Sequence, residues 1–195
     1  MIRWRFVSSV LLTAACLVYA GCANALVMTS AAPAPARVDE MRGLPNFGAV
    51  SEGLYRGAQP TAEGFQILEA RGIRTVISLR DWHDDAPLLA GTQLKYVHLP
   101  CSPLGVREAD VIAFLKVVKA PENQPVFVHC EFGADRTGMM VGAYRVVMLG
   151  WSNEAAAKEL ASYGFHEVFG PIRRYVEKME GERLRRGMGI TAGQV

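Results

Sequence analysis

Histidine is scarce in this sequence, and so are the spacings by which proteins bind metals. The chain of 195 residues contains only four histidines, at positions 83, 98, 129 and 166. No two of them stand at the short spacing of a metal-binding motif. We therefore expect no metal, and nothing in the sequence indicates another cofactor.

The chain also lacks a large excess of one charge. It has 21 lysines and arginines against 19 acidic residues, and without Arg3 and Arg5 the two signs balance at 19 each. The basic stretch RLRRG at 183–187 is short, and we expect it to be a solvated helix end, where the macrodipole favours positive charge. A nucleic-acid surface needs basic residues clustered on one face. We therefore expect no nucleic-acid partner.

The N-terminus has the composition of an export signal. Arg3 and Arg5 precede an uncharged stretch over 6–36, with its apolar centre at 7–20. A short basic start followed by such a stretch is typical of a segment that directs export rather than of folded structure. Residues 1–25 are therefore predicted to be an export signal.

Three outcomes for this signal remain open. The stretch VYAGC, ending at Cys22, resembles the lipobox of bacterial lipoproteins, although a tyrosine stands where leucine is usual. The small residues of ANA at 23–25 fit ordinary signal cleavage. Left uncleaved, 7–28 is long enough to span a bilayer, which requires about 20 apolar residues. Each outcome places the rest of the chain outside the cytoplasm, either in the periplasm or anchored to the membrane and facing it.

The remaining sequence divides into a linker, one domain and a tail. Residues 26–43 are rich in proline and alanine and are predicted to be a linker. The pattern becomes globular over 44–186, and apolar residues make up 50% of the whole chain, enough for a core. Residues 187–195 are predicted to be a flexible tail. We expect a monomer.

Strands and helices are predicted to alternate along the domain. Thr61 and Ser152 are candidate N-caps, because their hydroxyls can accept free backbone amides. Alternation of this kind predicts an α/β fold, with a central, mostly parallel sheet flanked by helices. The expected strands cover 53–60, 75–79, 95–99 and 126–128. The expected helices cover 62–71, 106–118, 137–150, 153–162 and 172–185.

The stretch HCEFGADRTG, at 129–138, joins a buried strand to a buried helix. Ligands of parallel sheets gather at the carboxyl ends of the strands, and Cys130 stands at such an end. The turn into the helix aims successive N–H groups inward and makes a nest for an anion. Gly133 permits a backbone angle that a side chain would oppose. The segment is therefore predicted to bind an anion, with a sulfur at the base of the site.

The same surroundings favour a reactive sulfur. Inward amides and a guanidinium favour the thiolate form of a cysteine, and Thr137 is placed to donate a hydroxyl hydrogen bond to Cys130. Arg136 offers a planar fork that matches two phosphate oxygens. Phosphoryl transfer to Cys130 is therefore the expected chemistry.

The motif resembles the signature of the cysteine-dependent protein tyrosine and dual-specificity phosphatases, in which His-Cys, five residues and Arg precede Ser or Thr. Residues 44–180 are also similar to a group of bacterial dual-specificity-like phosphatases. The resemblance implies a protein-tyrosine-phosphatase-like fold and hydrolysis through a cysteinyl-phosphate, with a phosphorylated protein or small phosphate ester as substrate. It implies Cys130 as nucleophile, Arg136 as phosphate clamp, and His129 and Thr137 in support. The backbone amides of the phosphate cradle would come from Glu131, Phe132, Gly133, Ala134, Asp135 and Arg136.

The general acid is the point at which the sequence departs from these relatives. They usually carry an aspartate in the loop after the strand that corresponds to 95–99, and here that loop has none before Asp110, which we expect inside the next helix. We select Asp135 as the acid, because some lipid phosphatases of the superfamily carry aspartate there. Three further candidates follow the strand at 75–79: Asp81, Asp84 and Asp85.

Other activities stay open at this point. A phosphoinositide or small-ester phosphatase would use the same mechanism, but Glu131 and Asp135 bring negative rather than positive charge to the loop. A sulfurtransferase, or a module that binds phosphate without catalysis, would also use an anion-binding loop. The arginine spacing favours phosphatase over the first, and retention of both Cys130 and Arg136 argues against the second.

The two cysteines outside the export signal, Cys101 and Cys130, raise the question of a disulfide. Exported proteins commonly form disulfides. Each cysteine follows a predicted strand, and if the two strands are neighbours the spacing permits a reversible bridge. The alternative is that Cys101 is a small packing residue.

Overall fold

A single mixed sheet runs through the part of the chain that the computed structural model describes, residues 41–190. Its strands are β1 (Gly48–Ser51), β2 (Leu54–Gly57), β3 (Thr75–Ser78), β4 (Lys95–His98) and β5 (Val126–His129). The helices are α1 (Ala62–Ala70), α2 (Glu108–Lys119), α3 (Asp135–Leu149), α4 (Asn153–Ser162), α5 (Gly170–Lys178) and α6 (Gly181–Gly187). Short 3-10 turns occupy Pro121–Asn123 and Glu167–Phe169.

The strand order is β1-β2-β5-β3-β4, which places β5 in the middle. All pairs are parallel except β1 and β2, so the predicted mostly parallel sheet is confirmed. The register pairs His129 at the end of β5 with Gly57 on one side and Ser78 on the other. The loops after β2, β3 and β5 therefore leave the sheet at the same level, side by side.

Strand β1 is the element that the sequence pattern did not predict. It has only four residues, GAVS, and a break in register lies between Ala49 and Ser51. Glycine and serine are weak strand formers, so local preference gives little signal here. Pairing with β2 is what orders the segment.

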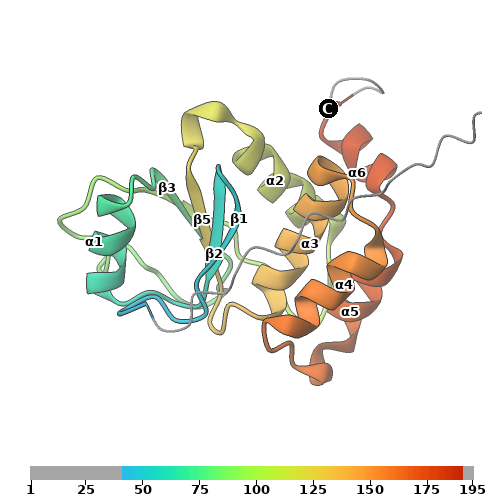
Figure 1. Cartoon of the computed structure of the whole chain (residues 1–195), viewed down its shortest axis with the longest axis horizontal. Helices are drawn as coiled ribbons and strands as arrows, with labels where there is room; N and C mark the ends of the chain where they lie inside the picture. Colours follow the sequence, from blue (N-terminus) through green and yellow to red (C-terminus); the bar gives the residue numbers. More distant parts are fainter. Residues whose placement is uncertain (1–40, 191–195) are drawn as a thin grey trace, which may run out of the picture. The chain divides into compact units, whose positions relative to one another are not determined.

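Helices cover both faces of the sheet (Figure 1). Helix α1 lies on one face over a small apolar cluster that includes Phe47, Phe65 and Phe127. Helices α2 to α6 lie on the other side, around a larger cluster. Helix α3 packs against α2, α4, α5 and α6 and is buried on most of its surface, so its first turn has a fixed position.

Several helix boundaries differ from the prediction. Helix α2 begins at Glu108, two residues later than expected, and helix α3 begins at Asp135, two residues earlier. The single helix expected over 172–185 is two helices, because the chain is extended at Met179, which is 6% exposed. The side chain of Asn153 stabilises this break by donating to the carbonyl of Met179 at 2.9 Å. The burial of Met179 therefore outweighs the helical preference of the surrounding sequence.

The domain also extends beyond its expected end at 186. Ile190 is 5% exposed and donates its backbone amide to the carbonyl of Arg185. Within residues 41–190, no helix is long and apolar enough to cross a membrane. In the same range, no group of three metal-ligating side chains comes together. The predicted export signal at 1–25 and residues 26–40 of the predicted linker lie outside the described residues.

Candidate active site

Four consecutive carbonyl oxygens of the loop after β5 are bound by donors outside the loop. The carbonyl of Cys130 lies 3.2 Å from Nδ1 of His129, and that of Glu131 accepts the backbone amide of Gln59 at 3.1 Å. The carbonyl of Phe132 accepts from the side chain of Asn46 at 3.0 Å. The next carbonyl, of Gly133, accepts from the guanidinium of Arg56 at 2.8 Å. These bonds therefore hold the four carbonyls outward from the centre of the loop, towards the surrounding protein.

The amides of the same loop are left available. Within the described part of the chain, the backbone N–H groups of 131–136 donate to no protein acceptor. They precede or begin α3, where the helix macrodipole adds positive potential. A loop with its carbonyls outward and its amides unused is suited to bind an anion.

Gly133 is required by the shape of this loop. Its φ is +68°, and a Cβ atom there would lie 2.4 Å from the carbonyl carbon of Gly57. The positive φ disfavours any side chain, and the close approach to the end of β2 excludes even a methyl group. The loop and strand β2 are therefore in direct backbone contact.

Cys130 and Arg136 lie at the two ends of the loop. The cysteine is 1% exposed, so its sulfur is at the base of the site. The guanidinium of Arg136 donates from Nη1 to the carbonyl of Leu79 at 3.2 Å and lies 3.9 Å from Oδ1 of Asp81. A pocket of about 290 Å³ opens beside it. The pocket is lined by Arg80, Asp81, Trp82, His83, Pro103, Glu131 and Arg136.

His129 is held behind the cysteine by a buried carboxylate. Its Nε2 lies 2.8 Å from Oδ2 of Asp85, and both side chains are fully buried. Its Nδ1 faces the carbonyl of Cys130. The two contacts together fix the orientation of the imidazole next to the cysteine.

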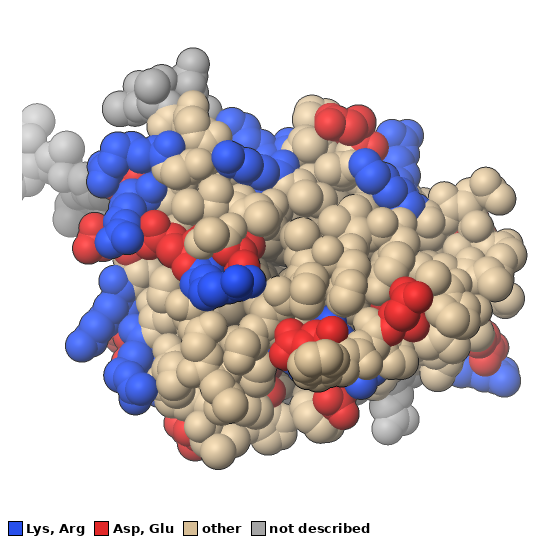
Figure 2. All heavy atoms as spheres, turned by 180° about the vertical axis from the view of Figure 1, so that it is seen from behind, with Lys and Arg blue, Asp and Glu red and all other residues tan. Residues whose placement is uncertain are grey.

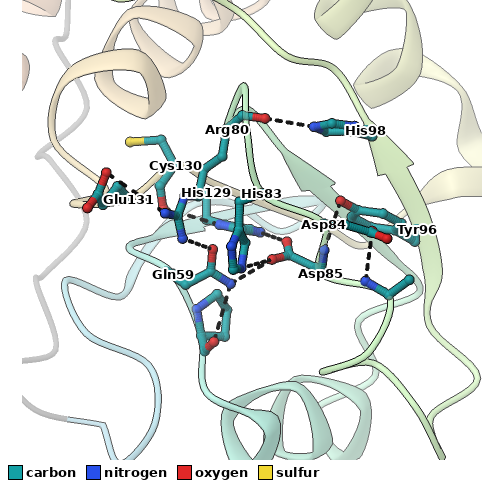
Figure 3. Close-up of polar contacts among 12 residues, drawn as sticks. Gln59, Arg80, His83, Asp84, Asp85, Tyr96, His98, His129, Cys130 and Glu131 are labelled. Atoms are coloured by element: carbon teal, nitrogen blue, oxygen red, sulfur yellow. Dashed lines mark hydrogen bonds and ion pairs between the residues drawn. The ribbon is translucent and has the colours of Figure 1, made fainter.

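Asp85 belongs to a polar network that joins three loops of the sheet edge (Figure 3). Gln59 donates to Asp85 at 2.8 Å and accepts from Arg80 at 2.9 Å. His83 lies 3.2 Å from the same carboxylate. Burial alone would raise the pKa of Asp85, but the interactions with His129, Gln59 and His83 together bring it below its ordinary value. The carboxylate is therefore ionised at neutral pH despite its burial.

Arg56, which binds the carbonyl of Gly133, supports the loop from inside the protein. It is fully buried in β2, and its guanidinium lies 3.6 Å from the centre of the Tyr163 ring. Burial lowers the pKa of Arg56 to about 10, with Glu159, Tyr163 and Cys130 acting in the other direction. The group therefore remains a cation at neutral pH, and it attracts a negatively charged sulfur at Cys130.

Asp135, the residue selected as acid from the sequence, is buried under the loop. It is 2% exposed, and its Oδ1 accepts the backbone amide of His166 at 2.8 Å. Its Oδ2 lies 2.9 Å from Nδ1 of the same histidine. This carboxylate connects α3 to the segment after α4, and its role as acid stays a prediction.

The hydroxyl of Thr137 is also buried, and it has no hydrogen-bond partner among residues 41–190. The expected bond from this hydroxyl to the sulfur of Cys130 is therefore not formed in the structure. The hydroxyl keeps its capacity to donate to a charged sulfur.

The remaining sequence candidates lie apart from the loop or face other groups. Asp110 is in α2, as expected, and forms two hydrogen bonds with Arg107 at 2.9 and 2.8 Å. Asp84 accepts the amide of Ala86 in its own loop.

Cys101 and Cys130 are both free thiols. Strand β3 lies between β4 and β5, the strands that precede them, so the idea that those two strands are neighbours was wrong.

Several residues that build the site were missed by sequence reasoning. Asn46, Arg56 and Gln59 bind the loop from strands or loops that are distant in sequence. Asp85 was considered only as a candidate acid, yet it is fully buried. The one local signal was an arginine inside a four-residue strand that is otherwise apolar or glycine, since an unpaired charge is rarely buried.

Comparisons with known proteins agree with this geometry. Residues 39–168 match the family model described as "DSP-PTPase phosphatase fused to NAD+ Kinase". The dual specificity protein phosphatase TpbA of Pseudomonas aeruginosa (strain UCBPP-PA14) is 34% identical over 164 residues, which cover 82% of this chain and 74% of TpbA. A crystal structure of P. aeruginosa TpbA superposes with a TM-score of 0.71 at 29% identity, covering 80% of this chain and 98% of that one. Inositol diphosphatase DSP5 of Arabidopsis thaliana is 28% identical over 149 residues, which cover 72% of each chain.

The fold and the loop after β5 thus define a phosphatase of the protein tyrosine phosphatase type. The chain belongs to the dual-specificity phosphatase (DSP-PTPase) family. It is a cysteine-dependent phosphatase, a hydrolase of phosphorylated substrates.

Proposed function

We propose that this phosphatase hydrolyses phosphate monoesters in two steps, with Cys130 as the nucleophile. The sulfur attacks phosphorus and releases the alcohol or phenol, and water then releases phosphate from the cysteinyl-phosphate. The amides of 131–136 hold the phosphate oxygens, and Arg136 binds two of them through its planar fork. The observation that carries this proposal is the set of four outward carbonyls, which leaves the loop amides for the substrate.

We propose phosphotyrosine in proteins as the substrate class. Trp82 is 99% exposed at the pocket, and Phe132 is 55% exposed in the loop. Phe132 packs edge-to-face on His166, with the ring centres 5.2 Å apart. A phenyl phosphate bound beside exposed aromatic side chains can bury its ring against them. In support, a cysteine-to-serine variant of P. aeruginosa TpbA has been crystallised in complex with phosphotyrosine, at 28% identity to this chain.

An inositol diphosphate is the second candidate, because DSP5 is named for that activity. Such a substrate brings several phosphates to the pocket, and carboxylates there oppose them. Two negative side chains, Asp81 and Glu131, line the pocket together with two positive ones, Arg80 and Arg136. This balance of charge favours a substrate with a single phosphate.

A direct comparison of substrates tests this preference. We expect a higher kcat/KM for a phosphotyrosine peptide than for a phosphoserine peptide or an inositol diphosphate. Faster turnover of the inositol diphosphate would contradict the proposal.

Two variants test the mechanism. Cys130→Ser is expected to abolish turnover of an aryl phosphate while phosphate still binds, because the loop amides remain. Arg136→Lys is expected to lower kcat by about 10²–10³, as removal of a positioned transition-state donor does. Rapid quenching of the wild type would trap phosphocysteine, whereas a persulfide would indicate a sulfurtransferase. Full activity of either variant would overturn the assignment.

We also propose that residues 1–25 direct export and that the phosphatase acts as a monomer in the periplasm or at the membrane surface facing it. The sequence supports this through the basic start and the apolar run that follows it. Cell fractionation of the wild type and Cys22→Ser distinguishes the outcomes. A lipidated protein partitions with membranes, and Cys22→Ser abolishes that partitioning. A soluble protein beginning near Leu26 indicates ordinary cleavage. Size-exclusion chromatography tests the monomer.

A further inference from the structure

Release of a poor leaving group requires a proton donor in the pocket. An alkoxide or phenolate leaves slowly unless a positioned acid protonates it, and such an acid contributes about 10²–10⁴-fold to the rate. The acid must reach the ester oxygen on the open side of the phosphate, opposite the sulfur. The carboxyl groups near the loop differ in their contacts.

Two of them are engaged elsewhere. Asp135 is buried, and both of its oxygens face His166. Asp110 is bound by the fork of Arg107 in α2. Neither carboxyl lines the pocket beside Arg136.

Two other carboxyl groups face protein side chains and not the place where a phosphate would bind. Asp85 is fully buried against His129 and cannot reach a substrate. Glu131 lines the pocket, but its side chain is 49% exposed and lies 3.9 Å from Arg80. The carboxyl group of Glu131 therefore lies at the rim of the pocket, next to Arg80 and not next to Arg136.

Asp81 has the contacts that the acid needs. It follows Leu79 and Arg80 directly after β3, the strand next to β5, and so reaches the same edge of the sheet as Cys130. Its side chain is 30% exposed in the pocket, and its Oδ1 lies 3.9 Å from Nη1 of Arg136. A carboxyl that faces the phosphate-binding guanidinium also faces the ester oxygens of a phosphate held there.

We infer that Asp81 is the general acid and base of this phosphatase, an assignment that rests on the proposed two-step mechanism. In the first step the sulfur of Cys130 forms a bond to phosphorus, the P–O bond to the leaving group breaks, and the carboxyl of Asp81 gives its proton to that oxygen. In the second step the carboxylate of Asp81 takes a proton from water as the water oxygen bonds to phosphorus. The S–P bond breaks, and thiolate, phosphate and protonated Asp81 result.

The test uses two aryl phosphates and Asp81→Asn. Phenyl phosphate needs a proton for its leaving group, whereas p-nitrophenyl phosphate releases a stable phenolate without one. We expect kcat on phenyl phosphate to fall by about 10²–10⁴, a much smaller loss on p-nitrophenyl phosphate, and partial recovery in Asp81→Glu. Asp84→Asn is the matched control, because it makes the same change three residues along in the same loop and should leave both rates unchanged.

Equal losses on both substrates, with weaker inhibition by inorganic phosphate, would overturn the inference and show that Asp81 only holds Arg136. A selective loss in Glu131→Gln or Asp135→Asn instead would move the role to that residue. Cys130→Ser separates this result from failure of the proposed function. If that variant keeps its activity, the two-step mechanism itself is wrong, whatever Asp81 does.

Discussion

The imidazole of His129 and the carboxylate of Asp85 lie 2.8 Å apart, both fully buried, directly behind Cys130. The histidine is the last residue of β5, directly before the phosphate-binding loop, and the aspartate belongs to the loop after β3. Their contact therefore joins the binding of phosphate to the position of the segment that carries Asp81.

We expect Asp85→Asn to destabilise the protein strongly. Asparagine removes the charge that Gln59 and His129 face, and a buried polar group left without its partner costs about 1–3 kcal/mol. Urea denaturation measures the change, and Asp84→Asn, an exposed neighbour, is the control. A loss no larger than that of the control would show that the pair carries no net stability.

The unfolding free energy of the wild type should also depend on pH, because Asp85 has different pKa values in the folded and unfolded states. Its pKa in the folded state is below the ordinary value of 3.8, so the unfolded chain takes up the proton first as pH falls. The contribution is complete above about pH 5 and disappears as pH falls through 3.8 towards the folded pKa. The difference in unfolding free energy between wild type and Asp85→Asn should shrink between pH 5 and pH 3. A difference that stays constant over this range would contradict the assignment.

Arg56→Met should weaken phosphate binding more than it weakens the fold. Methionine fills a similar volume, and it removes two buried guanidinium nitrogens, Nε and Nη1, that have no hydrogen-bond partner among residues 41–190. The carbonyl of Gly133, however, loses its donor at 2.8 Å, and the loop loses a nearby positive charge. We expect a higher inhibition constant for inorganic phosphate with a small shift in melting temperature. Unchanged phosphate inhibition would show that Arg56 has only a packing role.

Gly133→Ala and Gly150→Ala form a matched pair. Both glycines have a φ of +68°, so each substitution carries a strain of about 1–2 kcal/mol. A Cβ at Gly150 meets nothing within 4 Å, whereas a Cβ at Gly133 meets the backbone of Gly57 at 2.4 Å. We expect Gly150→Ala to keep its activity and Gly133→Ala to lose it, as measured with an aryl phosphate. Equal activities would show that the loop adapts to the extra atom.

Cys101 should not protect the nucleophile by forming a disulfide. Burial raises its pKa to about 12, so the thiol form predominates strongly at pH 7. The end of β3 also separates it from Cys130, and Cys101 donates its backbone amide to the carbonyl of Leu79. After peroxide and then dithiothreitol, wild type and Cys101→Ala should recover equally. A bridged peptide detected by mass spectrometry would reverse this conclusion.

The sequence was sufficient wherever the deciding interactions are local. The strand, loop and anion nest around Cys130 were predicted from a β-branched run, a cysteine, a glycine at the turn and a buried helix. Each of these features depends on residues that are close together in the sequence. Thr61 and Ser152 were identified as N-caps for the same reason, and both accept the amide of the residue three positions on. The sequence pattern also predicted a mostly parallel sheet.

The surroundings of the loop required the folded sheet. Arg56 reaches the carbonyl of Gly133 from 77 residues away, and Asp85 meets His129 because the strand order places β3 next to β5. Periodicity cannot reveal such pairs, since a polar residue in a loop has the same pattern whether it is buried against a partner or solvated. For the same reason Asp81, Asp84 and Asp85 were indistinguishable in sequence, although in the structure they face Arg136, solvent and His129 respectively.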